Sequence, residues 1–297
     1  MEPKGVGVFR LVNVKGRASL EDHGQYFDVA RMLADEAFSH SLHAVAHSDQ
    51  LHELAARCLT GAGDGEIARV RLGPPVLGSR QIFGIGLNYL DHAGETGANL
   101  PPVPLTFTKF PTCLAGAGDE IGLSGDQVDW EVEIVAVVGA TASHVAVEEA
   151  WNYVAGLTLG QDISDRRVQR AGTPPQFSLG KSFSNYGPIG PAMVSSDSFV
   201  DRDDIALWCD VSSVRMQKSR SRHLIFSIPT LVAYLSSICT LLPGDLIFTG
   251  TPSGVGAARG QFLVPGDVIR SGAEVIGIFE NLCVAGAGPL PLSPPVV

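Results

Sequence analysis

The chain from Pro75 onward consists of short apolar segments separated by glycine and proline residues. Such segments, rich in valine, isoleucine, leucine and phenylalanine and bounded by turn residues, are typical of strands. The expected strands span residues 81–87, 103–109, 130–138, 154–162, 206–211 and 245–249. Two further segments, 147–153 and 228–237, predict helices. Because strands and helices do not alternate regularly, a doubly wound parallel sheet is disfavoured, and we expect a β-rich α+β fold.

The N-terminal part of the chain carries a different pattern. Residues 6–14 predict a strand that ends at a Lys15-Gly16 turn, and residues 27–38 and 49–59 predict helices. The sequence Leu72-Gly73-Pro74-Pro75 is typical of a linker. We therefore expect a small N-terminal α/β appendage over residues 1–73, a large β-rich domain over 74–285 and a proline-rich tail over 286–297.

Composition narrows the class of protein. Of the 297 residues, 45% are hydrophobic and 18% are charged, as in ordinary globular proteins. The formal charge of −10 argues against a nucleic-acid surface, which needs basic patches. We find no signal pattern at the N-terminus and no apolar run as long as a membrane span, so a cytoplasmic location is expected. The five cysteines are scattered and form no C-x-x-C pair, so neither a disulfide framework nor a zinc site is expected.

Three acids alternate with apolar residues at the start of one expected strand. Since successive side chains of a strand point to opposite faces, Asp129, Glu131 and Glu133 are expected on the same face. Aligned carboxylates repel one another unless a cation lies among them, and hard divalent ions such as Mg²⁺, Mn²⁺ or Ca²⁺ prefer oxygen ligands. The alternative is a solvated, acidic strand face. The run from Ile134 to Val138 predicts burial instead, and this favours a metal site.

His92 and Glu95 form a candidate acid–base pair. They are three residues apart, so they share a face if this stretch is a helical turn. A carboxylate beside a histidine orients the ring and raises its basicity, which is what the activation of water near neutral pH requires. The pair taken alone is more typical of a protein surface than of an acid–base site. Gly94 and Gly97 would allow this segment to move as a lid.

A second charged cluster follows the expected strand 154–162. Asp162, Arg166 and Gln169 are spaced to project in one direction from a helical turn. They would supply an anionic ligand, a fixed cation and an amide, although a helix-start acid with an intrahelical salt bridge has the same pattern. Lys181 is a lone charge beside apolar and glycine residues, and its role is ambiguous by itself.

Three other motifs give weaker signals. The segment Gly84-Ile85-Gly86-Leu87-Asn88 lacks the third glycine of a dinucleotide-binding fingerprint. The glycine-rich segment 249–256 lacks the lysine of a nucleotide-phosphate loop, but it suits a tight loop that presents N–H and hydroxyl groups to a small anion. His40, His43 and His47 could share a helical face, and a solvated face is favoured over zinc because no acid or cysteine completes the set.

Taken in order, these segments resemble the fumarylacetoacetate hydrolase family, in its acylpyruvate hydrolase and 2-hydroxyhepta-2,4-diene-1,7-dioate isomerase-like branch. The resemblance covers residues from about 80 to 270. The motifs that carry it are Gly86-Leu87-Asn88-Tyr89 with His92 and Glu95, Phe107-Thr108-Lys109, Asp129-Trp130-Glu131-Val132-Glu133, Gly160-Gln161-Asp162-Ile163-Ser164 with Arg166 and Gln169, Lys181-Ser182-Phe183 with Gly187-Pro188-Ile189-Gly190-Pro191, and Leu242-Pro243-Gly244-Asp245-Leu246-Ile247 leading into Thr249-Gly250-Thr251-Pro252.

The resemblance implies a mixed β-sandwich roll over residues 74–285, usually a homodimer, which binds one Mg²⁺, with Mn²⁺ or Ca²⁺ as alternatives. The implied metal ligands are Glu131, Glu133 and Asp162, so Asp129 is not among them. Ser212-Ser213 stands where the family commonly has an Asn-Gly turn, and Cys113 stands where it commonly has a small hydroxyl residue near the pocket.

The implied function is hydrolysis of a carbon–carbon bond in a β-diketo acid of the acylpyruvate or fumarylacetoacetate type, through an enolate that the metal stabilises. Alternatives are decarboxylation of oxaloacetate-like acids, isomerisation or hydration of unsaturated keto acids, and a catalytically idle dimeric binding protein. The implied site residues and their roles are His92 with Glu95 activating water, Lys181 and Gln169 stabilising the oxyanion, Arg166 near the charged oxygens of the substrate, and Thr251 at its carboxylate.

Overall fold

A long mixed sheet runs through the computed structural model, which describes residues 7–57, 59, 62–91 and 100–287. Ten of its strands follow one another across the sheet, and two short strands pair at its side. In sheet order the strands are β4 (Gly65–Glu66), β3 (Gln25–Asp28), β2 (Arg17–Asp22), β1 (Arg10–Val14), β14 (Gly187–Ser195), β12 (Val154–Gln161), β11 (Val132–Val138), β17 (Leu246–Phe248), β6 (Ile82–Gly86) and β7 (Leu105–Thr108), with β5 (Leu72–Gly73) beside β1 and β8 (Leu114–Ala115) beside β14.

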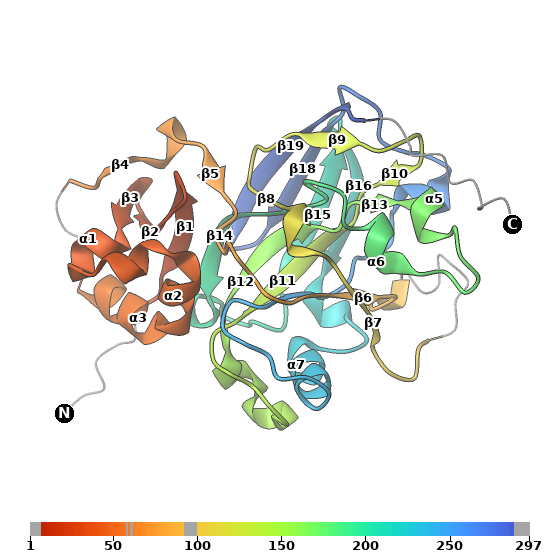
Figure 1. Ribbon diagram of the computed structural model, residues 1–297. Coiled ribbons are helices and arrows are strands. Elements are labelled where there is room, and N and C mark those ends of the chain that lie inside the picture. Colours follow the sequence, from red (N-terminus) through yellow and green to blue (C-terminus); the bar gives the residue numbers. More distant parts are fainter. Residues whose placement is uncertain (1–6, 58, 60–61, 92–99, 288–297) are drawn as a thin grey trace, which may run out of the picture.

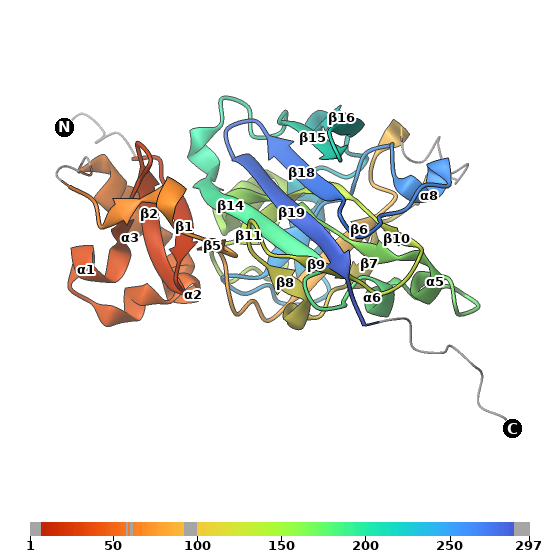
Figure 2. The same cartoon turned by 90° about the horizontal axis from the view of Figure 1, so that it is seen from above.

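A second sheet packs against the middle of the first. Its strands in order are β16 (Val214–Arg220), β15 (Ala206–Val211), β18 (Val268–Ala273), β19 (Gly277–Ala285) and β9 (Ile121–Leu123). Strands β11 and β12 contact β15 and β18, and Figure 2 shows β18 and β19 beside β14. Ile134 and Leu157 from one sheet and Leu207 and Ile269 from the other belong to a single buried cluster. The predicted β-rich α+β fold is therefore confirmed.

The helices are short and lie around the sheets (Figure 1). Among the described residues the α-helices are α1 (Val29–Leu33), α2 (Ser41–Ala46), α3 (Ser48–Ala56), α5 (Arg166–Gln169), α6 (Phe177–Gly180), α7 (Ile228–Ser236) and α8 (Gly256–Arg259), and the longest 3₁₀ segment is Val147–Tyr153. Helix α7 begins after Ser227, whose hydroxyl accepts a hydrogen bond from the Thr230 N–H, and it buries Leu231 and Leu235. The predicted helix 228–237 is thus confirmed, and 147–153 is helical with tighter 3₁₀ geometry. No helix among the described residues is long and apolar enough to cross a bilayer.

The N-terminal region departs from the prediction in two places. Residues 27–38 do not form one helix, because Phe27 pairs with Leu20 in the β2–β3 hairpin and Ala34 ends α1 in a left-handed conformation, with φ of 54°. Of the three histidines, His40 precedes α2, whereas His43 and His47 lie side by side at its C-terminal end, with ring centroids 4.2 Å apart. The N-terminal strands join the large sheet through pairing of β1 with β14, and the boundary at residue 73 stays a prediction.

The hairpin between β15 and β16 keeps a tight two-residue turn. Ser212 and Ser213 both have positive φ, at 47° and 71°. This left-handed pair of conformations is the one that Asn-Gly favours in such turns. The serines therefore change the residue type of the turn without removing its conformation.

Candidate active site

The three alternating acids do not lie on one continuous strand. Asp129 belongs to β10 (Val128–Asp129), which pairs with β13 (Ser164–Asp165), whereas Glu133 belongs to β11 and pairs with Gly160 of β12. The predicted strand 130–138 begins only at Val132, so the chain changes partner strand between Asp129 and Glu133. This separates Asp129 from the other two acids.

Glu131, Glu133 and Asp162 form a compact carboxylate cluster. Each offers one oxygen, and the three oxygens lie within 4.8 Å of one another. All three residues are buried. The backbone brings them together, because the Asp162 N–H donates to the Glu131 carbonyl at 2.8 Å as β12 ends beside the start of β11. These are the three residues that the family resemblance implied as metal ligands.

Two lysines bind this cluster from inside the protein. Lys181 Nζ donates to Glu131 Oε2 at 2.7 Å, Asp162 Oδ2 at 2.6 Å and Ser164 Oγ at 2.8 Å. Lys109 Nζ donates to Asp162 Oδ1 at 2.7 Å. In the sequence, Lys109 stands out only as part of a motif, without a role of its own. The one signal there is a charged residue at the end of the expected strand 103–109.

Arg166 and Gln169 lie on α5, beside the cluster. Asp165 caps this helix by accepting hydrogen bonds from the next backbone N–H groups, so Asp162 lies before the helix and forms no intrahelical salt bridge with Arg166. The Arg166 guanidinium instead donates to Asp129 at 2.7 Å, to Glu131 at 2.6 Å and to Gln169 Oε1 at 2.8 Å. Asp129 therefore serves as an anchor for Arg166.

Glu133 differs from its two neighbours. Its carboxylate accepts a hydrogen bond from the Gly250 N–H at 2.8 Å, and among the described residues no lysine or arginine forms an ion pair with it. Burial, reinforced by the negative charges of Asp162 and Glu131, raises its pKa well above the ordinary value. A buried carboxyl with no ion-pair partner in the described part of the chain, within an all-oxygen donor set, fits a hard divalent metal ion.

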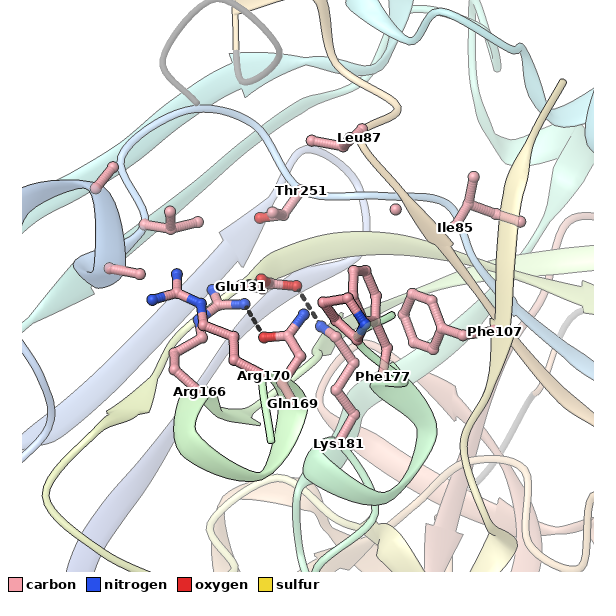
Figure 3. Close-up of a pocket in the computed structure, with 15 residues that line it drawn as sticks. Ile85, Leu87, Phe107, Glu131, Arg166, Gln169, Arg170, Phe177, Lys181 and Thr251 are labelled. Carbon is pink, nitrogen blue, oxygen red and sulfur yellow. Dashed lines mark hydrogen bonds and ion pairs between the residues drawn. The ribbon is translucent and has the colours of Figure 1, made fainter. Parts of the chain in front are cut away.

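Of the cluster, Glu131 lines a cavity of about 490 Å³, together with Arg166, Gln169 and Lys181. This volume is within the usual range for small-molecule sites. Figure 3 shows Arg166, Gln169 and Arg170 on one side of this pocket, facing Thr251 and Leu87. The apolar residues that line it are Ile85, Leu87, Phe107, Pro175, Phe177, Val255, Ala257 and Ala258. We call the buried network of the carboxylate cluster with Asp129, Arg166, Gln169, Lys109 and Lys181 the floor, and these apolar residues together with Arg170 the walls.

Thr251 reaches the pocket on a loop that glycine makes tight. Gly250 has a φ of 106°, and a Cβ there would lie 2.8 Å from Cβ of Asn88. The Thr251 hydroxyl donates to the Val132 carbonyl at 3.0 Å and accepts from Gln217 Nε2 at 2.8 Å. The loop is therefore joined to the start of β11, at the residue between Glu131 and Glu133.

The expected acid–base pair, His92 and Glu95, lies outside the described residues. The chain just before it is anchored to the same loop, because the Asn88 side chain donates to the Thr249 carbonyl at 2.7 Å and Ser253 Oγ donates to Asp91 at 3.0 Å. Cys113 is fully buried and is not among the pocket-lining residues.

Arg170 is a second residue that sequence reasoning missed. It follows α5, it is exposed, and it lines the pocket. Among the described residues that line the pocket, it is the cation whose side chain forms neither a hydrogen bond nor an ion pair with the protein. The sequence gives no signal for Arg170, because α5 is too short for a regular spacing of residues to be recognised.

Comparisons with known proteins show which sequences this chain resembles. The family description "Fumarylacetoacetate (FAA) hydrolase C-terminal" matches residues 81–284. A fumarylacetoacetate hydrolase domain-containing protein 2 homolog from Dictyostelium discoideum is 41% identical over 214 residues, covering 68% of this chain and 70% of that protein. The human mitochondrial oxaloacetate tautomerase FAHD2A is 36% identical over 214 residues, covering 71% and 68%.

Solved structures agree in fold. An HpcE-like protein from Mycobacterium smegmatis superposes with a TM-score of 0.88 at 39% identity, covering 94% of this chain and all of that one (100%). A maleylpyruvate hydrolase from Sphingobium, solved with manganese(II) and pyruvate, gives a TM-score of 0.79 at 25% identity, covering 94% and 100%. The fold and the family expected from the sequence motifs are both confirmed.

Proposed function

The chain belongs to the fumarylacetoacetate hydrolase family, and from this premise we propose that it is a metal-dependent hydrolase of carbon–carbon bonds in β-diketo acids of the acylpyruvate or fumarylacetoacetate type. Family membership alone does not select the reaction, because its relatives include hydrolases, isomerases and a tautomerase. The observation that carries the proposal is a buried carboxylate cluster beneath a pocket with apolar walls.

Glu131, Glu133 and Asp162 would hold Mg²⁺, with Mn²⁺ or Ca²⁺ as alternatives. The ion, when bound, supplies Lewis-acid stabilisation of the negative charge that develops on the enolate oxygen. The manganese and pyruvate of the Sphingobium maleylpyruvate hydrolase support this assignment, since pyruvate is the enol-derived fragment that an acylpyruvate would release.

The polar residues of the floor differ in the donors that they retain. Gln169 accepts from Arg166 through Oε1, which leaves its Nε2 group as a donor toward the substrate oxyanion. Lys181 already donates to three oxygens, so it would contact the oxyanion only by releasing one of them, most simply Ser164 Oγ. Otherwise it contributes positive potential and holds two ligands in place.

Arg166 and Thr251 also have most of their polar atoms engaged within the protein. Arg166 would act on the substrate mainly through its charge and through the orientation of Gln169. The Thr251 hydroxyl donates to Val132, so its contact with the substrate carboxylate stays a prediction. His92, oriented by Glu95, would take a proton from the water that attacks the distal carbonyl carbon.

The size and lining of the pocket favour a substrate larger than a four-carbon keto acid. A small dianion has no apolar part to place against Leu87, Phe107 and Phe177. An acylpyruvate would direct its acyl group there while its keto-acid end faces the floor. The exposed guanidinium of Arg170 would then interact with a charged end of the acyl group.

A second candidate is isomerisation, as keto–enol exchange of an oxaloacetate-like acid. The observation that favours it is the 36% identity with the human oxaloacetate tautomerase. This reaction also needs enolate stabilisation, but it does not require an activated water. Decarboxylation of the same acids would use the same enolate.

A substrate panel distinguishes these reactions. Chelated protein reloaded with Mg²⁺ would be assayed with acylpyruvates and oxaloacetate, following the enol absorbance and identifying the products. Hydrolysis releases a carboxylic acid and pyruvate, decarboxylation releases CO₂, and tautomerisation changes the absorbance without new products. We expect H92A to lose hydrolysis while it still binds the metal. Tautomerisation alone by the wild type would overturn the hydrolase proposal.

A further inference from the structure

Lys109 is the most deeply enclosed cation of the active-site floor. It follows β7, and its side chain has 0% exposure. Its Nζ donates to Asp162 Oδ1 at 2.7 Å, to the Tyr186 carbonyl at 3.1 Å and to the Lys181 carbonyl. All three ammonium donors are therefore engaged, and Lys109 does not line the pocket. Its role lies within the protein and not in contact with a substrate.

The contact with Asp162 is complementary to that of Lys181. Lys181 binds Oδ2 of this carboxylate, whereas Lys109 binds Oδ1 from the other side. Two cations thus fix both oxygens of one metal-ligand candidate. Lys109 also binds the backbone of Lys181, so a single ammonium group links the carboxylate to the segment that carries the second lysine.

The number of buried charges around Asp162 indicates what Lys109 does. Four buried carboxylates, Asp129, Glu131, Glu133 and Asp162, share the floor with three buried cations, Arg166, Lys181 and Lys109. The carboxylates of the metal-binding cluster repel one another at separations below 4.8 Å. Without Lys109, Asp162 would lose one of its two cations.

We propose that Lys109 is a positioning residue, a built-in counter-charge that holds Asp162 in its ligand position before a divalent cation arrives. This inference rests on the proposed function, because it takes Asp162 as a metal ligand. Loss of one partner from a buried ion pair is strongly destabilising, since it leaves an uncompensated charge. A bound divalent cation compensates part of that loss at the same carboxylate.

The test is thermal unfolding of full-length K109M, which keeps the aliphatic stem and loses the charge. The midpoint would be measured after chelation and again with saturating Mn²⁺. Relative to wild type, we expect a fall of roughly 5–15 °C in the metal-free protein and less than half of that with Mn²⁺. The rise that Mn²⁺ produces is therefore larger in K109M. The matched control is K218M, the same change at an exposed lysine, which should behave as wild type.

An equal fall with and without Mn²⁺, or a smaller Mn²⁺-induced rise, would overturn the proposal. K109R separates charge from shape, because it keeps the charge and should retain a rise close to that of wild type. If Mn²⁺ raises the midpoint of K109R by as much as that of K109M, the proposal would also be overturned. If K109M does not fold, refolding from urea decides: recovery only with Mn²⁺ supports the proposal, and no recovery with Mn²⁺ contradicts it.

The wild-type measurement separates this inference from the proposed function. If Mn²⁺ does not raise the wild-type midpoint, the metal site itself is wrong, and the role of Lys109 fails with it. If Mn²⁺ raises the wild-type midpoint, but the K109M midpoint lies below it by the same amount with and without Mn²⁺, only the role of Lys109 is wrong.

Discussion

The floor and the walls of the pocket are built on different principles. On the floor, the buried charges of Asp162 and Lys181 each contact two partners of opposite charge. On the walls, Leu87 and Phe177 are apolar, and the side chain of Arg170 has no partner among the described residues. A change on the floor disturbs a connected network, whereas a change on the wall does not. We infer that the floor determines the chemistry and the walls determine which acyl group is accepted.

The largest effect is expected on the floor, from E133Q. This variant removes one metal-ligand candidate while it keeps the shape and the Gly250 hydrogen bond. Because Glu133 has no cation partner among the described residues, the metal-free fold should survive. We expect kcat/KM with Mg²⁺ to fall by roughly 100-fold or more. This is a larger loss than is typical when a residue that only hydrogen-bonds to a metal ligand is replaced. The exposed control E148Q should retain activity, and a nearly active E133Q would remove Glu133 from the site.

The second prediction concerns pH. The pKa of Glu133 is raised in the metal-free protein by burial and by the nearby charges of Asp162 and Glu131. Its proton therefore stabilises the fold fully below the ordinary carboxyl pKa, and this contribution is lost as pH rises through the raised pKa. We expect the unfolding midpoint of chelated protein to fall with rising pH across that window, relative to E133Q.

Metal binding should show the opposite trend. Below the raised pKa of Glu133, a divalent ion must displace the proton of this carboxyl, so the affinity for the ion should increase as pH rises toward that pKa. The Mn²⁺-induced rise in the unfolding midpoint, measured at several pH values, checks this. If the Mn²⁺-induced rise in the midpoint is the same at every pH, or is identical in E133Q, proton loss by Glu133 and metal binding are not linked.

R170Q tests the wall at its charged end. For a diketo acid whose acyl group ends in a carboxylate, we expect kcat/KM to fall about 5- to 10-fold, since the guanidinium is exposed and its attraction is screened. A substrate of equal length with a neutral end is the internal control and should be unaffected. An equal loss for both substrates would place Arg170 in the common machinery of the floor.

F177A should give the smallest effect. Phe177 lines the wall, and its ring centroid lies 5.8 Å from that of Phe107. Truncation should raise KM for bulky acyl groups by roughly 5-fold through lost apolar contact, and leave kcat and metal affinity unchanged. A fall in metal affinity would contradict the separation of wall from floor.

The sequence predicted most of the floor because each of its residues belongs to an ordered motif. Glu131, Glu133, Asp162 and Lys181 come from three separate segments, and the structure brings them together. Sequence spacing also suggested Asp129 as a neighbour, but the strand changes partner before Glu133. That change depends on pairing with distant strands, which local alternation does not reveal.

Other features escaped prediction for physical reasons. Lys109 meets Asp162 only through tertiary packing, at a separation of 53 residues in the chain. Residues 27–38 have an apolar pattern suited to a helix, yet capping by Asp28 and the left-handed Ala34 confine α1 to Val29–Leu33. The roles of His92 and Glu95, the homodimer and the cytoplasmic location stay predictions.

Calorimetric titration of chelated protein with Mn²⁺ measures the metal site itself. We expect one ion bound per chain in wild type and in E148Q, and no measurable binding in E133Q under the same conditions. Equal binding by wild type and E133Q, or no binding by wild type, would contradict the assignment of Glu131, Glu133 and Asp162 as the metal site.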